Sequence, residues 1–189
     1  MIETLIELDQ DFFLFLNGLH FTWLDPIMYW ISGKMEWVPF YLLIVGVIIY
    51  RYKWKSILVL VCIGISIALA DQFTSGFMKP FFERLRPSHE PLFEGIVHHV
   101  NNYKGGKYGF ASSHAANSFS MAMFVWLLFH TKNKWVTLIF AWALLVSYSR
   151  IYLGVHYPAD IIVGGAVGVL SGIFSYKLFK WSDKRWFTK

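Results

Sequence analysis

Long apolar stretches constrain the fold of this 189-residue chain more than any other feature. Its residues are 56% hydrophobic and only 15% charged, which is more apolar surface than one small globule can hide from water. Lipid must cover the rest. The sequence therefore predicts an all-α, polytopic membrane helix bundle with about six transmembrane helices, formed by residues 20–33, 36–51, 56–80, 113–130, 135–153 and 158–180.

The first two of these segments are shorter than the other four, which each approach the ~20 residues that cross about 30 Å of hydrocarbon. Gly33 and Lys34 separate the two short segments. They could form two tilted spans, or one span and one surface helix, so the bundle has five or six spans. The side of the membrane on which the chain begins depends on that choice.

Residues 1–18 combine acidic and apolar side chains, beginning with Glu3, Leu5 and Glu7. This stretch has neither the basic leader nor the small-residue cleavage site of a secretory signal peptide. We expect an amphipathic helix at the membrane surface. A cap that docks on one end of the bundle is the alternative.

Basic residues indicate how the bundle is oriented. Once the spans alternate, many of them fall on one side, which the positive-inside tendency makes cytoplasmic. We expect a multi-pass protein of the cytoplasmic (inner) membrane whose opposite face, toward the periplasm or exterior, carries the chemistry. The net charge of +5 needs no nucleic-acid partner, and we expect a single domain over residues 1–189. The basic residues on the cytoplasmic side are Arg51, Lys53, Lys55, Lys132, Lys134, Lys177, Lys180, Lys184, Arg185 and Lys189.

The run from Ser149 to Asp160 places an arginine, a histidine and a carboxylate close together beside two apolar segments. His156 and Asp160 are four residues apart, so both side chains can share one face of a helix that begins near Pro158. The carboxylate can hold one imidazole nitrogen and leave the other as a base or a nucleophile. Arg150, always charged and forked, suits an oxyanion of a phosphoryl group. This pattern indicates phosphate chemistry at a membrane surface.

Two further groups emerge on the same face of the predicted bundle. Lys79 and Arg86, seven positions apart, could reach one phosphate from two directions, although basic residues at span ends often only snorkel to the interface. Ser112, Ser113 and His114 are typical of a helix start, where free backbone amides attract an anion. The histidine can give a proton to a departing alkoxide, and a structural histidine is the alternative.

Together these three groups resemble the three-part signature of the type 2 phosphatidic acid phosphatase superfamily, in both order and spacing. The resemblance implies a phosphatase/haloperoxidase-like helical core and a reaction that needs no metal and no cofactor. In that reaction His156 attacks phosphorus, Asp160 orients His156, and His114 protonates the lipid leaving group. The resemblance also implies that the phosphate oxygens are bound by Lys79, Arg86, Ser112, Ser113 and Arg150.

The second group departs from the usual pattern of the superfamily. The family motif usually reads Pro-Ser-Gly-His, whereas this chain has Ala111, Ser112, Ser113 and His114. Ser113 adds a side chain where a glycine would let the backbone approach the phosphate closely. We expect the same chemistry with a different loop geometry.

The function implied by the resemblance is hydrolysis of a terminal phosphate from a lipid phosphate or diphosphate that stays in the bilayer. Undecaprenyl diphosphate, phosphatidylglycerol phosphate, phosphatidic acid and lipid A phosphates are candidates, and the sequence does not choose among them. A phosphotransferase with the same phosphohistidine, or a non-catalytic protein that binds or flips lipid phosphates, is the alternative. Soluble vanadium haloperoxidases have a similar pocket, but the lipid-spanning composition argues against them. The oligomeric state stays open.

Polar residues outside the signature have weaker interpretations. For Asp71, inside an apolar segment, a hydrogen-bonded brace is favoured over a role in ion coupling. Histidines in the loop 88–109 match no familiar metal-ligand spacing. The glycine-rich end of that loop could read the lipid headgroup, or could be a flexible connection that keeps Tyr103 and Tyr108 at the interface.

Overall fold

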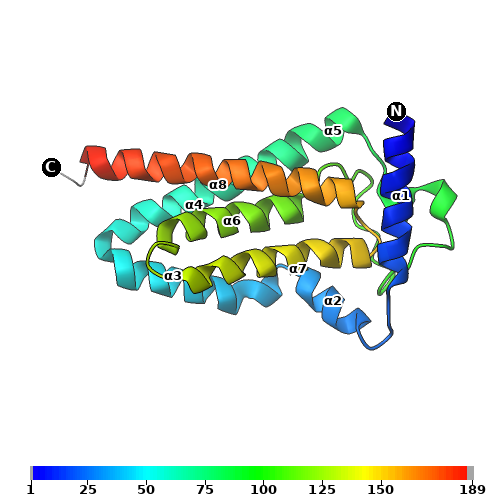
Figure 1. Cartoon of the computed structure of the whole chain (residues 1–189), viewed down its shortest axis with the longest axis horizontal. Coiled ribbons are helices and arrows are strands. Elements are labelled where there is room, and N and C mark those ends of the chain that lie inside the picture. The colour runs from blue at the N-terminus through cyan, green and yellow to red at the C-terminus, as the bar shows by residue number, and fades with distance from the viewer. Residues whose placement is uncertain (1, 187–189) are drawn as a thin grey trace.

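The computed structural model describes residues 2–186, which form helices joined by turns and loops. The long helices lie side by side along the long axis of the molecule (Figure 1). They confirm the predicted all-α, polytopic bundle. These helices are α3 (Val38–Tyr52), α4 (Ser56–Asp71), α6 (Ser113–Phe129), α7 (Ile139–Tyr152) and α8 (Pro158–Trp186).

Three helical stretches in the described part of the chain are long and apolar enough to cross a membrane: Met35–Phe82, Lys134–Tyr152 and Pro158–Trp186. The first turns back at a 3-10 turn, Lys53–Lys55, so that α3 and α4 are antiparallel and supply two crossings (Figure 1). α6 has 17 residues, which extend about 25 Å at 1.5 Å per residue and reach the lower limit for a span. Multiple crossings therefore follow from helix length and composition together.

The length of helix α2 (Asp25–Ser32) bears on how the chain first crosses the membrane. It has eight residues, or about 12 Å, which is too short for a crossing. It ends at Gly33, and α3 continues from it toward the same far end of the bundle (Figure 1). Residues 20–33 and 36–51 therefore do not form two long helices, and the described residues hold five long helices, which is compatible with the five or six spans expected.

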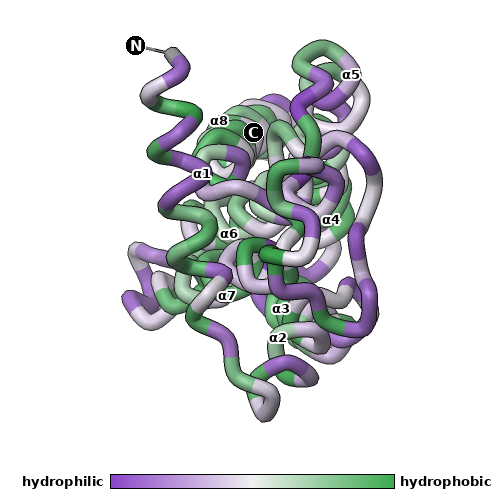
Figure 2. Tube along the Cα trace, turned by 90° about the vertical axis from the view of Figure 1, so that its right-hand side faces the viewer, coloured by the Kyte–Doolittle hydropathy of each residue, from purple (hydrophilic) through white to green (hydrophobic). Residues whose placement is uncertain are grey.

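Helix α1 (Ile2–Gly18) lies across one end of the bundle, nearly perpendicular to the long helices (Figure 1). Phe13 and Asn17 point into the molecule and are almost fully buried, whereas Leu5, Leu8 and Phe12 are more than half exposed. Viewed from that end, hydrophobic and hydrophilic residues alternate along the helix (Figure 2). α1 is thus docked on the bundle and also presents an apolar outer face, so both expectations for residues 1–18 hold in part.

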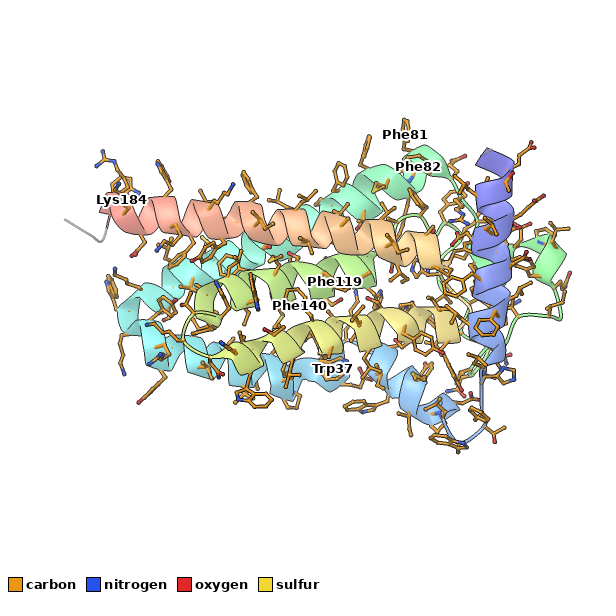
Figure 3. All side chains as sticks on the ribbon, viewed as in Figure 1. Trp37, Phe81, Phe82, Phe119, Phe140 and Lys184 are labelled. Carbon is orange, nitrogen blue, oxygen red and sulfur yellow. The ribbon has the colours of Figure 1, made fainter. Side chains whose placement is uncertain are left out.

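The end of the α4 crossing is irregular. After Asp71 the chain makes a π-helical turn, Gln72–Met78, and then the short helix α5 (Lys79–Phe82). Phe81 and Phe82 point away from the bundle there (Figure 3). Such wide turns are frequent at functional sites.

The predicted basic side of the protein is one end of the bundle. Both tight connections at the end remote from α1, between α3 and α4 and between α6 and α7, carry lysines, and Lys184 lies at the same end (Figures 1 and 3). Lys189 lies outside the described residues. The end that bears α1 is therefore opposite the basic end.

Candidate active site

The predicted site residues meet at the end of the bundle that α1 covers. A cavity of about 650 Å³ opens there, lined by five of them: Lys79, Arg86, Ser113, His114 and Arg150. The remaining three, Ser112, His156 and Asp160, join the group through hydrogen bonds described below. Residues from α5 to α8 thus form one constellation, as the sequence predicted.

His156 and Asp160 form the buried centre of this constellation. Leu153 to Tyr157 connect α7 to α8, and α8 begins at Pro158, so Asp160 stands in the first turn of the helix. The Nδ1 atom of His156 lies 3.2 Å from Oδ2 of Asp160, and neither side chain is more than 1% exposed. The predicted four-residue spacing therefore places the carboxylate on the imidazole.

Arg86 determines which nitrogen of His156 carries the proton. Its Nη1 lies 3.3 Å from Nε2 of His156, and a guanidinium can only donate hydrogen bonds. Nε2 must then be the unprotonated nitrogen, and Nδ1 donates its proton to Asp160. Arg86 itself is held by the carbonyl oxygens of Tyr108, 3.1 Å from its Nε, and Val155, 3.3 Å from Nη1.

The environment also keeps His156 neutral. Burial, together with the positive charges of Arg86, Arg150 and Lys79, holds the pKa of His156 well below its usual range. A neutral imidazole with a free Nε2 lone pair is the form that can attack an electrophile. The site therefore holds His156 as a neutral imidazole whose Nε2 carries no proton.

Lys79 is positioned by hydroxyl groups. Its Nζ donates to Oγ of Ser113 at 2.9 Å, and the same hydroxyl lies 2.6 Å from Oγ of Ser75 and 3.1 Å from Oγ1 of Thr74. Ser75 and Thr74 belong to the π-helical turn, so Ser113 ties the start of α6 to that turn. The departure from the family motif places a hydroxyl group next to Lys79.

Arg150 points from α7 into the same cavity. Its Nη2 donates to the hydroxyl of Tyr103 at 3.0 Å, and its Nη1 contacts the hydroxyl of Ser32 at the end of α2. Its Nε has no hydrogen-bond partner among the described residues, although Arg150 is only 3% exposed. A buried donor of this kind remains available to an anion.

Ser112 and His114 stand at the start of α6. Ser112 is its N-cap, with Oγ 3.5 Å from the amide of Ala115, and its own amide donates to the carbonyl oxygen of Asp160 at 3.0 Å. This bond joins the second group of the signature to the third. His114 lines the cavity together with Arg150.

The loop 88–109 supports the site more closely than the sequence indicated. Tyr103 holds Arg150, and the backbone of Tyr108 holds Arg86. His98 is engaged elsewhere, with Nε2 2.9 Å from Oδ1 of Asp25. The tyrosines of this loop therefore position the two arginines instead of serving only as interface residues.

Three further residues at or near the site had no assigned role or only a weak one in the sequence. Asp71 accepts from Nδ2 of Asn117 at 3.1 Å, which agrees with the favoured brace. Arg84 contacts Asp160, and Asp9 contacts Arg84. Arg84 stands inside the first group of the signature, but no local spacing shows that its partners lie so far along the chain.

The cavity continues from these cations into an apolar space between helices. Its deeper wall is formed by α3 on one side and by α4, α6 and α7 on the other. One end of a ligand would thus meet positive charge, and the rest would meet hydrocarbon. The apolar residues that line it include Ile44, Ile48, Leu60, Ile63 and Val146.

Comparison with known proteins identifies a family for this chain. Residues 57–184 match the sequence profile of the PAP2 superfamily. The chain is 42% identical to the lipid A 4'-phosphatase of Porphyromonas gingivalis, over 98% of this chain and 78% of that protein. It is 40% identical to the lipid A 4'-phosphatase of Bacteroides thetaiotaomicron, over 93% of this chain and 79% of that protein.

A solved structure shares the fold. The transmembrane PAP2 type phosphatidylglycerolphosphate phosphatase from Bacillus subtilis superposes with a TM-score of 0.69. The alignment covers 97% of this chain and 89% of that chain at 24% sequence identity. At that identity the likeness shows the arrangement of helices and carries no argument about substrate.

Proposed function

This chain belongs to the PAP2 superfamily, as a membrane lipid phosphatase, and from that premise we propose that it works through a phosphohistidine on His156. The observation that carries the proposal is the state of His156. Its Nδ1 is fixed on Asp160, and its Nε2 lies beside Arg86 at the cavity that Lys79 and Arg150 also line.

In the first step, Nε2 of His156 attacks phosphorus and the bond from phosphorus to the lipid oxygen breaks. His114 gives its proton to the departing alkoxide. In the second step, water attacks the phosphohistidine and returns a proton to His114, which releases inorganic phosphate and neutral His156. Asp160 stabilises the positive charge that develops on the imidazole.

The cations Lys79, Arg86 and Arg150 bind the phosphate oxygens in this scheme. Arg86 must exchange its contact with Nε2 for the incoming phosphoryl group, so substrate binding uncovers the nucleophile. The unpartnered Nε of Arg150 gives that residue a donor to spare. Three cationic side chains supply charge stabilisation of the kind that a metal ion supplies in other phosphoryl-transfer sites, so the proposed reaction needs no metal.

Among lipid phosphates, we propose the lipid A type as the first candidate. The support is that two relatives with this activity in their names align over nearly the whole chain. The apolar part of the cavity suits an acyl chain of any of the candidate lipids, so it does not distinguish them. The substrate remains in the bilayer while its phosphate reaches the cations.

We also propose that the site faces the periplasm or exterior of the cytoplasmic membrane. The support is the opposite placement of the site and of the lysine-rich turns along the bundle. Cysteine labelling from outside intact cells tests this proposal. A cysteine placed at exposed Asn102, in the loop over the site, should react, and one at exposed Lys53 should not.

Phosphate release by purified full-length protein tests the reaction. Wild type and His156→Ala should be compared in detergent with a chelator present, on lipid A, undecaprenyl diphosphate, phosphatidylglycerol phosphate and phosphatidic acid. We expect metal-independent release from at least one lipid, and a loss of about 10⁴-fold or more in the variant, as for removal of other catalytic nucleophiles. A 32P-labelled lipid should leave acid-labile label on the wild-type protein only.

Two outcomes would contradict hydrolysis by this protein. Release only when an acceptor lipid or sugar is added would identify a phosphotransferase. Equal lipid binding by wild type and His156→Ala, without release by either, would identify a binding or flipping protein.

A further inference from the structure

The two carboxylate oxygens of Asp160 have different partners. Oδ2 accepts the amide of Tyr157 at 3.0 Å and faces Nδ1 of His156, whereas Oδ1 accepts from Nη1 of Arg84 at 3.0 Å. The Asp160 side chain is 0% exposed, so water does not offer either oxygen a substitute. Arg84 therefore occupies the oxygen that His156 does not use, and the carboxylate has one orientation.

Arg84 is held in turn by the first helix. Its Nη2 donates to Oδ2 of Asp9 on α1 at 2.7 Å. The guanidinium carbon also lies 4.0 Å from the centroid of the Tyr157 ring, in the range of a cation–π contact. The planar guanidinium is thus fixed by two carboxylates and one aromatic face.

Asp9 also holds the beginning of α8. Its Oδ1 accepts the amide of Ala159 at 2.8 Å. Ala159 is the second residue of α8, and amides in the first turn of a helix have no partner within that helix. Asp9 therefore caps α8 from a different helix and fixes the turn on which Asp160 stands.

We propose that Asp9 and Arg84 are positioning residues for the nucleophile, and that α1 is thereby part of the active site. The inference rests on the proposed function, because it concerns how His156 is oriented for attack. The family signature assigns roles to Lys79 and Arg86 but none to Arg84 between them. A carboxylate that Arg84 no longer fixes would hold the imidazole less firmly in its nucleophilic tautomer and orientation, and outer contacts of this kind are worth about 10–100-fold in activity.

Steady-state kinetics of the full-length protein test the proposal. Arg84→Met should lower kcat about 10–100-fold and leave KM within about threefold, because no phosphate contact is removed. Arg84→Lys should recover part of the loss, since it keeps the charge but cannot span both carboxylates. Asp9→Asn should have a smaller effect, because its amide oxygen can still cap Ala159.

The matched control is Asp11→Asn, which removes an exposed carboxylate from the same helix and should leave kcat unchanged. The double variant Asp9→Asn/Arg84→Met should be no slower than Arg84→Met, since the asparagine keeps the cap on Ala159 and the other contact of Asp9 is with Arg84. Unchanged kcat in Arg84→Met, with only a lower melting temperature, would overturn the inference. Failure of the proposed function would show separately, as absence of activity in wild type.

Discussion

α6 and α8 approach each other so closely that a Cβ atom added at Gly168 would collide with the carbonyl oxygen of Ala116. α3 borders the same interior across a cavity of about 650 Å³, and a Cβ atom added at its Gly46 would meet nothing within 4 Å. Gly46 is exposed on the surface of α3, whereas the buried glycines of α8 allow close contact with the backbone of α6.

The difference separates two tasks within one small bundle. His114 at the start of α6 and Asp160 at the start of α8 must keep their relative positions, and small residues let the two helices pack without a gap. In the proposed function, the cavity beside α3 holds the lipid. Close backbone packing is therefore found in the α6–α8 pair, and open space beside α3.

Among changes to helix packing and to the cavity, Gly168→Leu should have the largest effect, because the side chain has no space between α6 and α8. We expect activity to fall by more than 100-fold and the melting temperature in detergent to drop, since overpacking costs about 1–3 kcal/mol or more. Gly46→Leu is the matched control on α3 and should retain both the activity and the melting temperature. Equal losses of activity and of melting temperature in the two variants would show that the α6–α8 contact and α3 do not differ in packing.

The dependence of kcat/KM on pH tests how strongly the protein shields His156 from water. Its pKa lies below the usual value, so the neutral nucleophile persists on acidification and the acid limb of kcat/KM should lie below about pH 6.5. Below that pKa, protonation blocks attack and the rate should fall about tenfold per pH unit. If the midpoint of the acid limb is the same for two substrates whose phosphate groups differ in pKa, the titrating group belongs to the enzyme. A limb centred above pH 6.5 would contradict the buried environment.

Val45→Trp should fill the apolar part of the cavity beside α3 without reaching the phosphate site. Val45 lines the cavity from α3, so we expect kcat/KM to fall about threefold to tenfold for a long-chain lipid phosphate and to change little for a short-chain, water-soluble one. Leu42→Trp, at an exposed position of the same helix, is the control. Equal effects on both substrates would mean that the cavity does not hold the acyl chain.

Ser113→Ala should have the smallest effect. Ser113 links α6 to the π-helical turn and to Lys79. It belongs to the closely packed α6 and also lines the cavity beside α3. Without its hydroxyl, Lys79 loses one of its contacts, and we expect KM to rise about threefold with kcat unchanged. Ser118→Ala removes a hydroxyl that bonds only to carbonyl oxygens of its own helix and should change neither. A larger loss in kcat would give Ser113 a direct role in the reaction.

Much of the site could be predicted because several of its contacts join residues that are close together in the sequence. His156 and Asp160 are near neighbours in the chain, so the start of a helix at Pro158 suffices to bring them together. Ser112 acts as an N-cap for the same reason, because the cap and the helix it serves are adjacent in sequence. These relations depend on backbone geometry over a few residues, which spacing alone conveys.

Contacts between distant segments could not be predicted in this way. Nothing near Asp9 in the sequence indicates that it caps Ala159, and nothing near Arg84 shows that it joins both Asp9 and Asp160. The hydroxyl of Ser113 could equally have crowded the phosphate, and only the packed π-helical turn shows that it faces Lys79. Each contact depends on how whole helices lie against one another.

The sequence by itself determined that this protein is a helical membrane bundle, and it predicted a phosphate site at one end. Hydrophobic length, helix-start residues and short spacings carry that information, since the bilayer and the hydrogen-bonded backbone impose the same rules on every chain. The tertiary structure alone decided that α2 is a short separate helix and that α1 lies across the end of the bundle where the candidate site residues meet. It alone also placed a cavity of about 650 Å³ beside α3, because these features follow from side-chain packing between segments that no local pattern connects.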